Sequence, residues 1–203
     1  MSSIGGNERL KHVLTFNDVI IIGKEKEFYI NDSRQIVNVG NKIVAIQAHN
    51  QEIYVLYENS RSVGVSVYGL TREKIKKKVT WEAKGLKRCT GFVIKNDKVF
   101  IADKDKSQIR VYTLKGKVSD DDCKQIVEHE VRKEEIRLIK RNYIIVSDKD
   151  GQVVYKLNAK TLQIDRDNTR YPVMDMFCVD EEDTLWAWNK KENQLKHTKT
   201  ESG

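Results

Sequence analysis

The stretch KVFIADKDKSQIRVYTLKG, from Lys98 to Gly116, contains two apolar runs on either side of a short polar segment. The runs VFIA and IRVY are rich in β-branched and aromatic residues, which favour strands. The polar segment DKDKS between them consists largely of residues that favour tight turns. The stretch therefore predicts a β-hairpin, and the fold of the chain depends on whether this hairpin recurs.

The same pattern does recur along the chain. The stretch EIYVLYENSRSVGVSVYGL, from Glu52 to Leu70, aligns with the first without a gap and lies 46 residues before it. Looser copies begin at Val19, Tyr143 and Thr184. A short apolar run such as IVAI, CTGFVI or MFCV precedes each later copy, and a further strand-like segment such as KIKKKVTWEA follows some of them. The unit is therefore three or four short strands, repeated about every 40 residues.

This repeat predicts an all-β chain folded as a β-propeller, with about five recognisable blades of three to four antiparallel strands. Inner strands such as VFIA and YIIV are continuous apolar runs because neighbouring blades would cover both of their faces. A β-sandwich or barrel whose strands resemble one another by chance is the alternative, and the gapless match favours the propeller. We expect residues 1–12 to form a flexible N-terminus and residues 13–200 to form a single propeller domain, complete, partial or trimmed. If the ring closes, residues near Leu14–Ile22 would supply the strand that the last unit lacks.

The segment KVSDDDCKQIVEHEVRKEEIRLIK, from Lys117 to Lys140, fits this pattern least well. It could carry a short amphipathic helix with Ser119 as its N-cap. We expect instead a long charged loop and an outer strand of a blade.

The stretch that begins at Lys98 resembles the core of an NHL repeat. In that pattern an apolar strand ends in an Ala-Asp pair, here Ala102-Asp103, and a polar turn leads to a second strand with an arginine, here Arg110, and then to a glycine, here Gly116. The other four copies keep the strands but are degenerate, and a WD-repeat-like propeller is the second choice. The resemblance implies a propeller whose faces serve interaction. Several NHL propellers bind single-stranded RNA through a basic face.

The composition is basic. The chain has 203 residues, of which 39% are hydrophobic and 33% are charged, with a formal net charge of +7. A basic balance favours nucleic acid, acidic membrane surfaces or acidic proteins as partners. The alternative is an ordinary lysine-rich surface, because 30 acidic residues accompany the 37 basic ones.

Three widely spaced cysteines favour reduced thiols and hence a cytoplasmic protein, with a nuclear one as the alternative. No stretch has the features of a signal peptide or the length of a membrane span, so we expect no membrane partner.

No catalytic pattern is evident. The four histidines are far apart and show no metal-ligand spacing, and no glycine-rich phosphate loop is present. The segment Asp103-Lys104-Asp105 begins like a calcium loop but has Leu114, not Glu, at the twelfth position. We interpret it as a hairpin turn in which an Asp side chain accepts hydrogen bonds from nearby backbone N–H groups. The sequence thus predicts a non-enzymatic protein with no cofactor, no metal site and no small-molecule substrate.

One basic segment is a candidate binding site. In a strand, Lys74, Lys76 and Lys78 would lie on one face, and Trp81 could stack on a base or on a side chain of an acidic partner. The candidate residues for binding RNA or an acidic partner are Lys74, Lys76, Lys78, Trp81, Lys84, Lys87 and Arg88. Lysines that merely protect an edge strand from aggregation are the alternative.

The predicted function is a non-enzymatic β-propeller scaffold for protein–protein interaction, working within a larger protein or complex. The alternative is an NHL-like propeller that binds RNA through a basic face.

Overall fold

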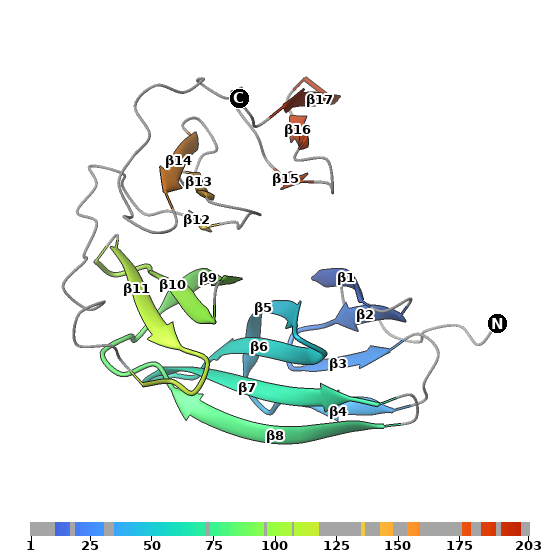
Figure 1. Ribbon diagram of the computed structural model, residues 1–203, viewed down its shortest axis with the longest axis vertical. Helices are drawn as coiled ribbons and strands as arrows, with labels where there is room; N and C mark the ends of the chain where they lie inside the picture. Colours follow the sequence, from blue (N-terminus) through green and yellow to red (C-terminus); the bar gives the residue numbers. More distant parts are fainter. Residues whose placement is uncertain are drawn as a thin grey trace. The chain divides into compact units, whose positions relative to one another are not determined.

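A computed structural model shows that the chain is built from antiparallel β-sheets (Figure 1). It describes residues 11–16, 19–30, 35–71, 74–95, 97–106, 108–117, 135–136, 143–147, 154–158, 176–179, 184–189 and 192–199. Seventeen strands and no helix occur within these ranges. The strands form five sheets of three or four strands each, and strands that are neighbours in a sheet are neighbours in sequence. The prediction of an all-β chain with antiparallel sheets of this size is confirmed.

Two compact units make up the chain, residues 1–88 and residues 89–203, and each is described by itself. The predicted flexible start over residues 1–12 lies almost wholly outside the described residues, which begin at Lys11. The first strand already begins at His12.

The first unit contains two four-stranded sheets. The first sheet comprises β1 (His12–Phe16), β2 (Val19–Gly23), β3 (Glu27–Ile30) and β4 (Ile36–Asn38). The second sheet comprises β5 (Lys42–His49), β6 (Glu52–Glu58), β7 (Val63–Leu70) and β8 (Ile75–Glu82). The expectation that residues near Leu14–Ile22 complete the last sheet is wrong, because β1 and β2 pair with each other and β2 pairs with β3. A hairpin closes a much shorter loop than a pairing between the two ends of the chain, and its entropic cost is lower.

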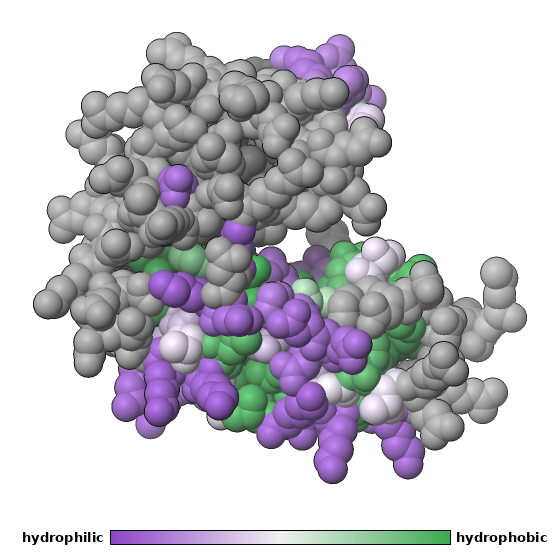
Figure 2. Space-filling view, viewed as in Figure 1, coloured by the Kyte–Doolittle hydropathy of each residue, from purple (hydrophilic) through white to green (hydrophobic). Residues whose placement is uncertain are grey.

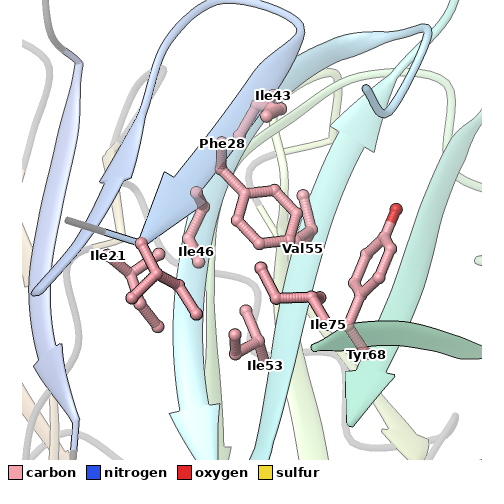
Figure 3. Packing of buried hydrophobic residues seen from close by; sticks show 9 residues of the cluster. Ile21, Phe28, Ile43, Ile46, Ile53, Val55, Tyr68 and Ile75 are labelled. Carbon is pink, nitrogen blue, oxygen red and sulfur yellow. The ribbon is translucent and has the colours of Figure 1, made fainter. Parts of the chain in front are cut away.

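Apolar side chains from these two sheets form one core (Figure 3). Alternation sends every second side chain of a strand into it, and in β5 a bulge after Ile43 brings in Ile46 three residues later. Phe28 of β3 meets Tyr68 of β7 edge to face, with ring centroids 5.1 Å apart. The buried members are Ile21, Phe28, Ile30, Ile43, Ile46, Ile53, Val55, Tyr68 and Ile75.

The second sheet is also buried on its other face. Val65 and Val67 of β7 point away from this core and are buried as well. The one buried polar side chain described on β7, Ser66, has its hydroxyl 3.0 Å from that of Thr80. Burial raises the pKa of Tyr57 and of Tyr68, although the Ser66 side chain opposes this. The Ser66–Thr80 bond joins β7 to β8.

The second unit contains three sheets of three strands each. The third sheet comprises β9 (Cys89–Lys95), β10 (Lys98–Asp103) and β11 (Gln108–Thr113). The fourth comprises β12 (Glu135–Ile136), β13 (Tyr143–Ser147) and β14 (Val154–Asn158). The fifth comprises β15 (Met176–Val179), β16 (Thr184–Asn189) and β17 (Gln194–Lys199). The helix considered from Ser119 onward lies outside the described residues.

The hairpin that first suggested the fold is β10–β11, paired from Lys98 opposite Thr113 to Asp103 opposite Gln108. Asp103 is only 4% exposed. Its Oδ1 accepts hydrogen bonds from the backbone N–H groups of Asp105 (3.0 Å) and Lys106 (3.2 Å). The interpretation of this segment as a turn held by an Asp side chain is therefore confirmed.

Candidate functional site

Strand β8 is an exposed edge strand. It pairs with β7 on one side, and no strand among the described residues pairs with its other side. The five consecutive residues 76–80 are all exposed, which is the longest such run among the strand residues whose burial is described. In Figure 1 it runs along the lower rim of the first unit, and hydrophilic side chains gather along this rim in Figure 2. An edge of this kind presents unpaired backbone groups as well as side chains.

Both ends of β8 are nevertheless firmly held. Ile75 is buried in the core of the first unit, and Trp81 is only 9% exposed. Just beyond the strand, the Ala83 N–H donates to the Val63 carbonyl at 2.9 Å. The strand is therefore exposed along its middle without being loosely attached.

A bulge interrupts the pairing of β8 with β7. Tyr68 lies opposite Lys77 and the adjacent Val67 lies opposite Val79, so Lys78 has no direct partner in the ladder. A bulge of this kind shifts which side chains share a face. After the bulge, Val79 lies on the same face of the sheet as Lys76. Without the bulge, alternation would place Thr80 on that face instead.

Alternate backbone groups of β8 point away from β7. In an antiparallel pair, every second residue directs its N–H and C=O toward the partner and the others direct them outward. The Ala83–Val63 bond fixes this alternation after the bulge, so the backbone groups of Thr80 and Glu82 point outward. Before the bulge, the outward residues are Ile75 and Lys77.

Gln35 already occupies the outer edge at one point. Its Oε1 accepts from the Ile75 N–H at 2.8 Å, and its Nε2 donates to the Ile75 carbonyl at 2.9 Å. The side-chain amide thus pairs with Ile75 as the peptide groups of an adjacent strand would. Gln35 directly precedes β4, so this bond also ties the two sheets of the unit together.

The bulged Lys78 is committed to an ion pair. Its Nζ donates to Glu52 Oε1 at 2.7 Å, and the Tyr54 hydroxyl donates to Glu52 Oε2 at 2.8 Å. Burial alone would raise the pKa of Glu52, but the bonds from Lys78 and Tyr54 outweigh it and hold that pKa below 4.5. The Lys78 side chain lies across Gly69, where an added Cβ would meet its Cε at 2.6 Å. Lys78 therefore acts mainly within the sheet.

The other predicted lysines are placed differently. Lys76 lies opposite Gly69 on the same face as Lys78, and Lys74 lies in the turn before β8. Both are exposed, as are Lys84, Lys87 and Arg88 in the loop after the strand. Most of the Trp81 ring is covered by the protein, which leaves little surface for the predicted stacking.

Three contributors to this site were not among the sequence candidates. Lys77 belongs to the basic run, but strict alternation would place it on the face opposite Lys74, Lys76 and Lys78. Gln35 and Glu52 are far from β8 in sequence, and no local pattern marks them as its neighbours. The basic run itself was the one signal that pointed to this strand.

The described residues contain no group of three or more His, Cys, Asp or Glu side chains that could hold a metal ion. Within the same part of the chain, no helix has the length and apolar character to cross a membrane.

Comparisons with known proteins bear on the fold. No protein-family model matches the chain, and no curated protein matches it. A protein of unknown function from Bacteroides caccae is similar in structure, with a TM-score of 0.66 and 11% identity over 90% of this chain and 74% of the other. A functionally unknown protein from Desulfotomaculum acetoxidans has a TM-score of 0.64 at 11% identity, covering 97% of this chain and 71% of the other. Hsv2 from Kluyvelomyces marxianus has a TM-score of 0.54 at 13% identity, covering 91% of this chain and 57% of the other. At such identities the likeness shows a shared fold alone.

Proposed function

We propose that the chain is a non-enzymatic β-propeller scaffold of NHL-like repeats that binds a protein partner through the edge of β8. One observation carries the binding site: β8 is held at both ends yet exposes five residues in a row, residues 76–80. A surface that is rigid, uncovered and basic suits the recognition of an acidic protein.

The repeated architecture supports the propeller. Five sheets of three or four antiparallel strands follow one another in chain order, as blades do. The first sheet also has a second apolar face, on which Val13, Ile22, Tyr29 and Ile36 lie in one row across all four strands. In a propeller, a row of this kind packs against another blade.

RNA binding is the second candidate. The exposed Lys76 and Lys77, followed by the basic loop with Lys84, Lys87 and Arg88, favour it because phosphates bind to such clusters. The covered Trp81 ring and the pairing of Lys78 with Glu52 weigh against it. We therefore rank an acidic protein partner first.

Affinity capture with matched variants tests this function. The full chain is immobilised and exposed to extract of the cells that produce it, beside the double variant Lys76→Glu/Lys77→Glu. The control is Lys104→Glu/Lys106→Glu, which makes the same charge change on the exposed β10–β11 turn.

We expect a protein that is retained in stoichiometric amount by the parent and the control, is lost with the β8 variant and resists ribonuclease. Calorimetry with that purified protein should reproduce the difference. Retention that is equal for all three proteins would contradict the assignment of β8, and material that ribonuclease removes would favour RNA.

A further inference from the structure

We propose that the partner binds by adding an extended acidic strand to the outer edge of β8. This inference rests on the proposed function and specifies both the chemistry of the partner and the way it binds. Strand addition supplies main-chain hydrogen bonds for affinity, while side chains on both sides of the new strand supply specificity.

The backbone of β8 offers the hydrogen bonds that such a strand needs. The N–H and C=O groups of Lys77 and Thr80 point away from β7, and no bond to them occurs among the described residues. The side chains of residues 76–80 are exposed, and the Gln35 amide occupies the edge only at Ile75.

Gln35 shows that the edge accepts a peptide-like group. Its amide makes both an N–H and a C=O bond to Ile75, the first outward residue of β8. An added strand would continue this pairing along the same edge, with Lys77 as the next outward residue and Thr80 beyond the bulge.

The positive charge of β8 favours an acidic partner strand. Neither Lys76 nor Lys77 has a side-chain partner among the described residues, and they lie on opposite faces of the sheet. Acidic side chains at alternate positions of an added strand share one face. They would therefore meet a lysine whichever face they take, Lys76 on one face or Lys77 on the other. A second copy of β8 would set lysine against lysine, which is unfavourable in cross-strand pairs. The edge thus resists self-association and still admits an acidic partner.

The anchoring of β8 favours this mode of binding. Ile75 and Trp81 are buried, and the hydroxyl of Thr80 is bonded to that of Ser66. A strand that is already ordered loses little further conformational entropy when a peptide pairs with it.

The probe for the test is a fluorescein-labelled peptide of sequence EVEVEVE, followed by fluorescence anisotropy at physiological salt. A second peptide with the same side chains carries N-methyl groups on alternate amides, which removes the N–H groups along one edge. A single-stranded oligouridylate is the third probe, because it presents negative charge without a peptide backbone.

Two variants at one position separate hydrogen bonding from charge. Lys77→Pro removes the outward N–H and the charge, whereas Lys77→Thr removes the charge alone. Proline is tolerated on an edge strand where its nitrogen faces outward. Thermal unfolding checks that both variants fold, and amide hydrogen exchange of the parent with and without peptide gives a readout that needs no variant.

We expect saturable binding of EVEVEVE, slower exchange at the Lys77 and Thr80 amides, and markedly weaker binding of the N-methylated peptide. The loss of one backbone hydrogen bond should make Lys77→Pro bind about three- to tenfold more weakly than Lys77→Thr. Equal binding of the two peptides, or equal affinity of the two variants, would overturn strand addition.

Failure of this inference is distinguishable from failure of the proposed function. If EVEVEVE does not bind while capture still depends on Lys76 and Lys77, the acidic-strand inference is wrong and the protein-binding function stands. The oligouridylate could instead bind where the peptide does not, with this binding abolished by Lys76→Glu/Lys77→Glu. The acidic-strand inference and the protein-binding function would then both be wrong, and RNA binding would be favoured.

Discussion

At the scale of single residues, Asp103 is the clearest case of one side chain that holds a local structure. Its two carboxylate oxygens have different partners: Oδ1 accepts from the backbone of the turn, and Oδ2 accepts from Arg110 Nε at 3.2 Å. Arg110 lies on the facing strand β11, so one buried carboxylate joins the turn to the hairpin.

Replacement of Asp103 by alanine should therefore destabilise the protein. We expect Asp103→Ala to lower the free energy of unfolding by about 2–4 kcal/mol, because the turn N–H groups lose their acceptor and Arg110 loses its counter-ion. Urea denaturation measures this loss. Lys104→Ala, on the exposed part of the same turn, is the control and should change stability by less than about 0.5 kcal/mol. Equal effects would mean that the carboxylate does not hold the hairpin.

His12 gives the protein a predicted dependence on pH. Burial lowers the pKa of His12 below 6.5, and a hydrogen bond with the Ile43 backbone only partly opposes this. Its Nε2 is buried and has no hydrogen-bond partner among the described residues. As the pH drops, His12 is therefore protonated near pH 6.5 in the unfolded chain but only at a lower pH in the folded protein. The free energy of unfolding consequently falls as the pH drops below about 6.5.

We expect His12→Gln to make the free energy of unfolding less dependent on pH. A single titrating group can account for at most about 1.4 kcal/mol per pH unit. Urea midpoints of parent and variant at pH 7.5 and pH 5.5 provide the comparison. Because the other titrating groups are common to both proteins, parallel pH dependences would show that His12 does not cause the effect.

At the scale of secondary-structure elements, the β5–β6 hairpin contains an unfavourable residue. Its two turn residues, Asn50 and Gln51, both have positive φ angles, 46° and 60°. Two-residue turns of this type fit the twist of the flanking strands, and asparagine followed by glycine suits them best. Asn50 fits that preference, whereas Gln51 carries a Cβ in a conformation that glycine adopts more readily.

Gln51→Gly should therefore stabilise the protein by about 0.5–1 kcal/mol, because it relieves the left-handed conformation. Differential scanning calorimetry measures the corresponding rise in Tm. Gln51→Ala is the matched control: it removes the same side chain but keeps the Cβ, so it should bring no such gain. A similar rise for both variants would assign the gain to loss of the long side chain and not to backbone strain.

At the scale of the whole molecule, the second apolar face of the first sheet tests the propeller. Val13 is 64% exposed and Ile36 is 62% exposed in the structure. If another blade packs on this face in solution, Val13→Lys and Ile36→Lys should each cost about 1.5–3 kcal/mol of unfolding free energy. If the face is open, each should change it by less than about 0.5 kcal/mol.

Chemical denaturation of the two variants decides between these outcomes, with Val79→Lys on β8 as the control outside this face. Large losses for Val13→Lys and Ile36→Lys, with little loss for Val79→Lys, would support a closed ring. Small losses for all three would contradict it.

The sequence by itself determined the strands, the hairpins and the turn at Asp103. Each of these depends on residues close together in the chain: an apolar run pairs with the next run across a short turn, and Asp103 bonds to N–H groups two and three residues ahead. Local propensity and short loop closure are enough to specify such features.

Only the tertiary structure decided what the basic strand presents to a partner. Lys78 is bound to Glu52, 26 residues away, and Ile75 is bound to Gln35, 40 residues away. The bulge opposite Val67 moves Val79 onto the face of Lys76, and packing covers Trp81. A strand sequence specifies which side chains alternate, but it does not specify which distant residues will lie beside them or where the ladder will slip. The ion pair, the amide at the edge and the outward backbone groups therefore arise only when the sheets have packed.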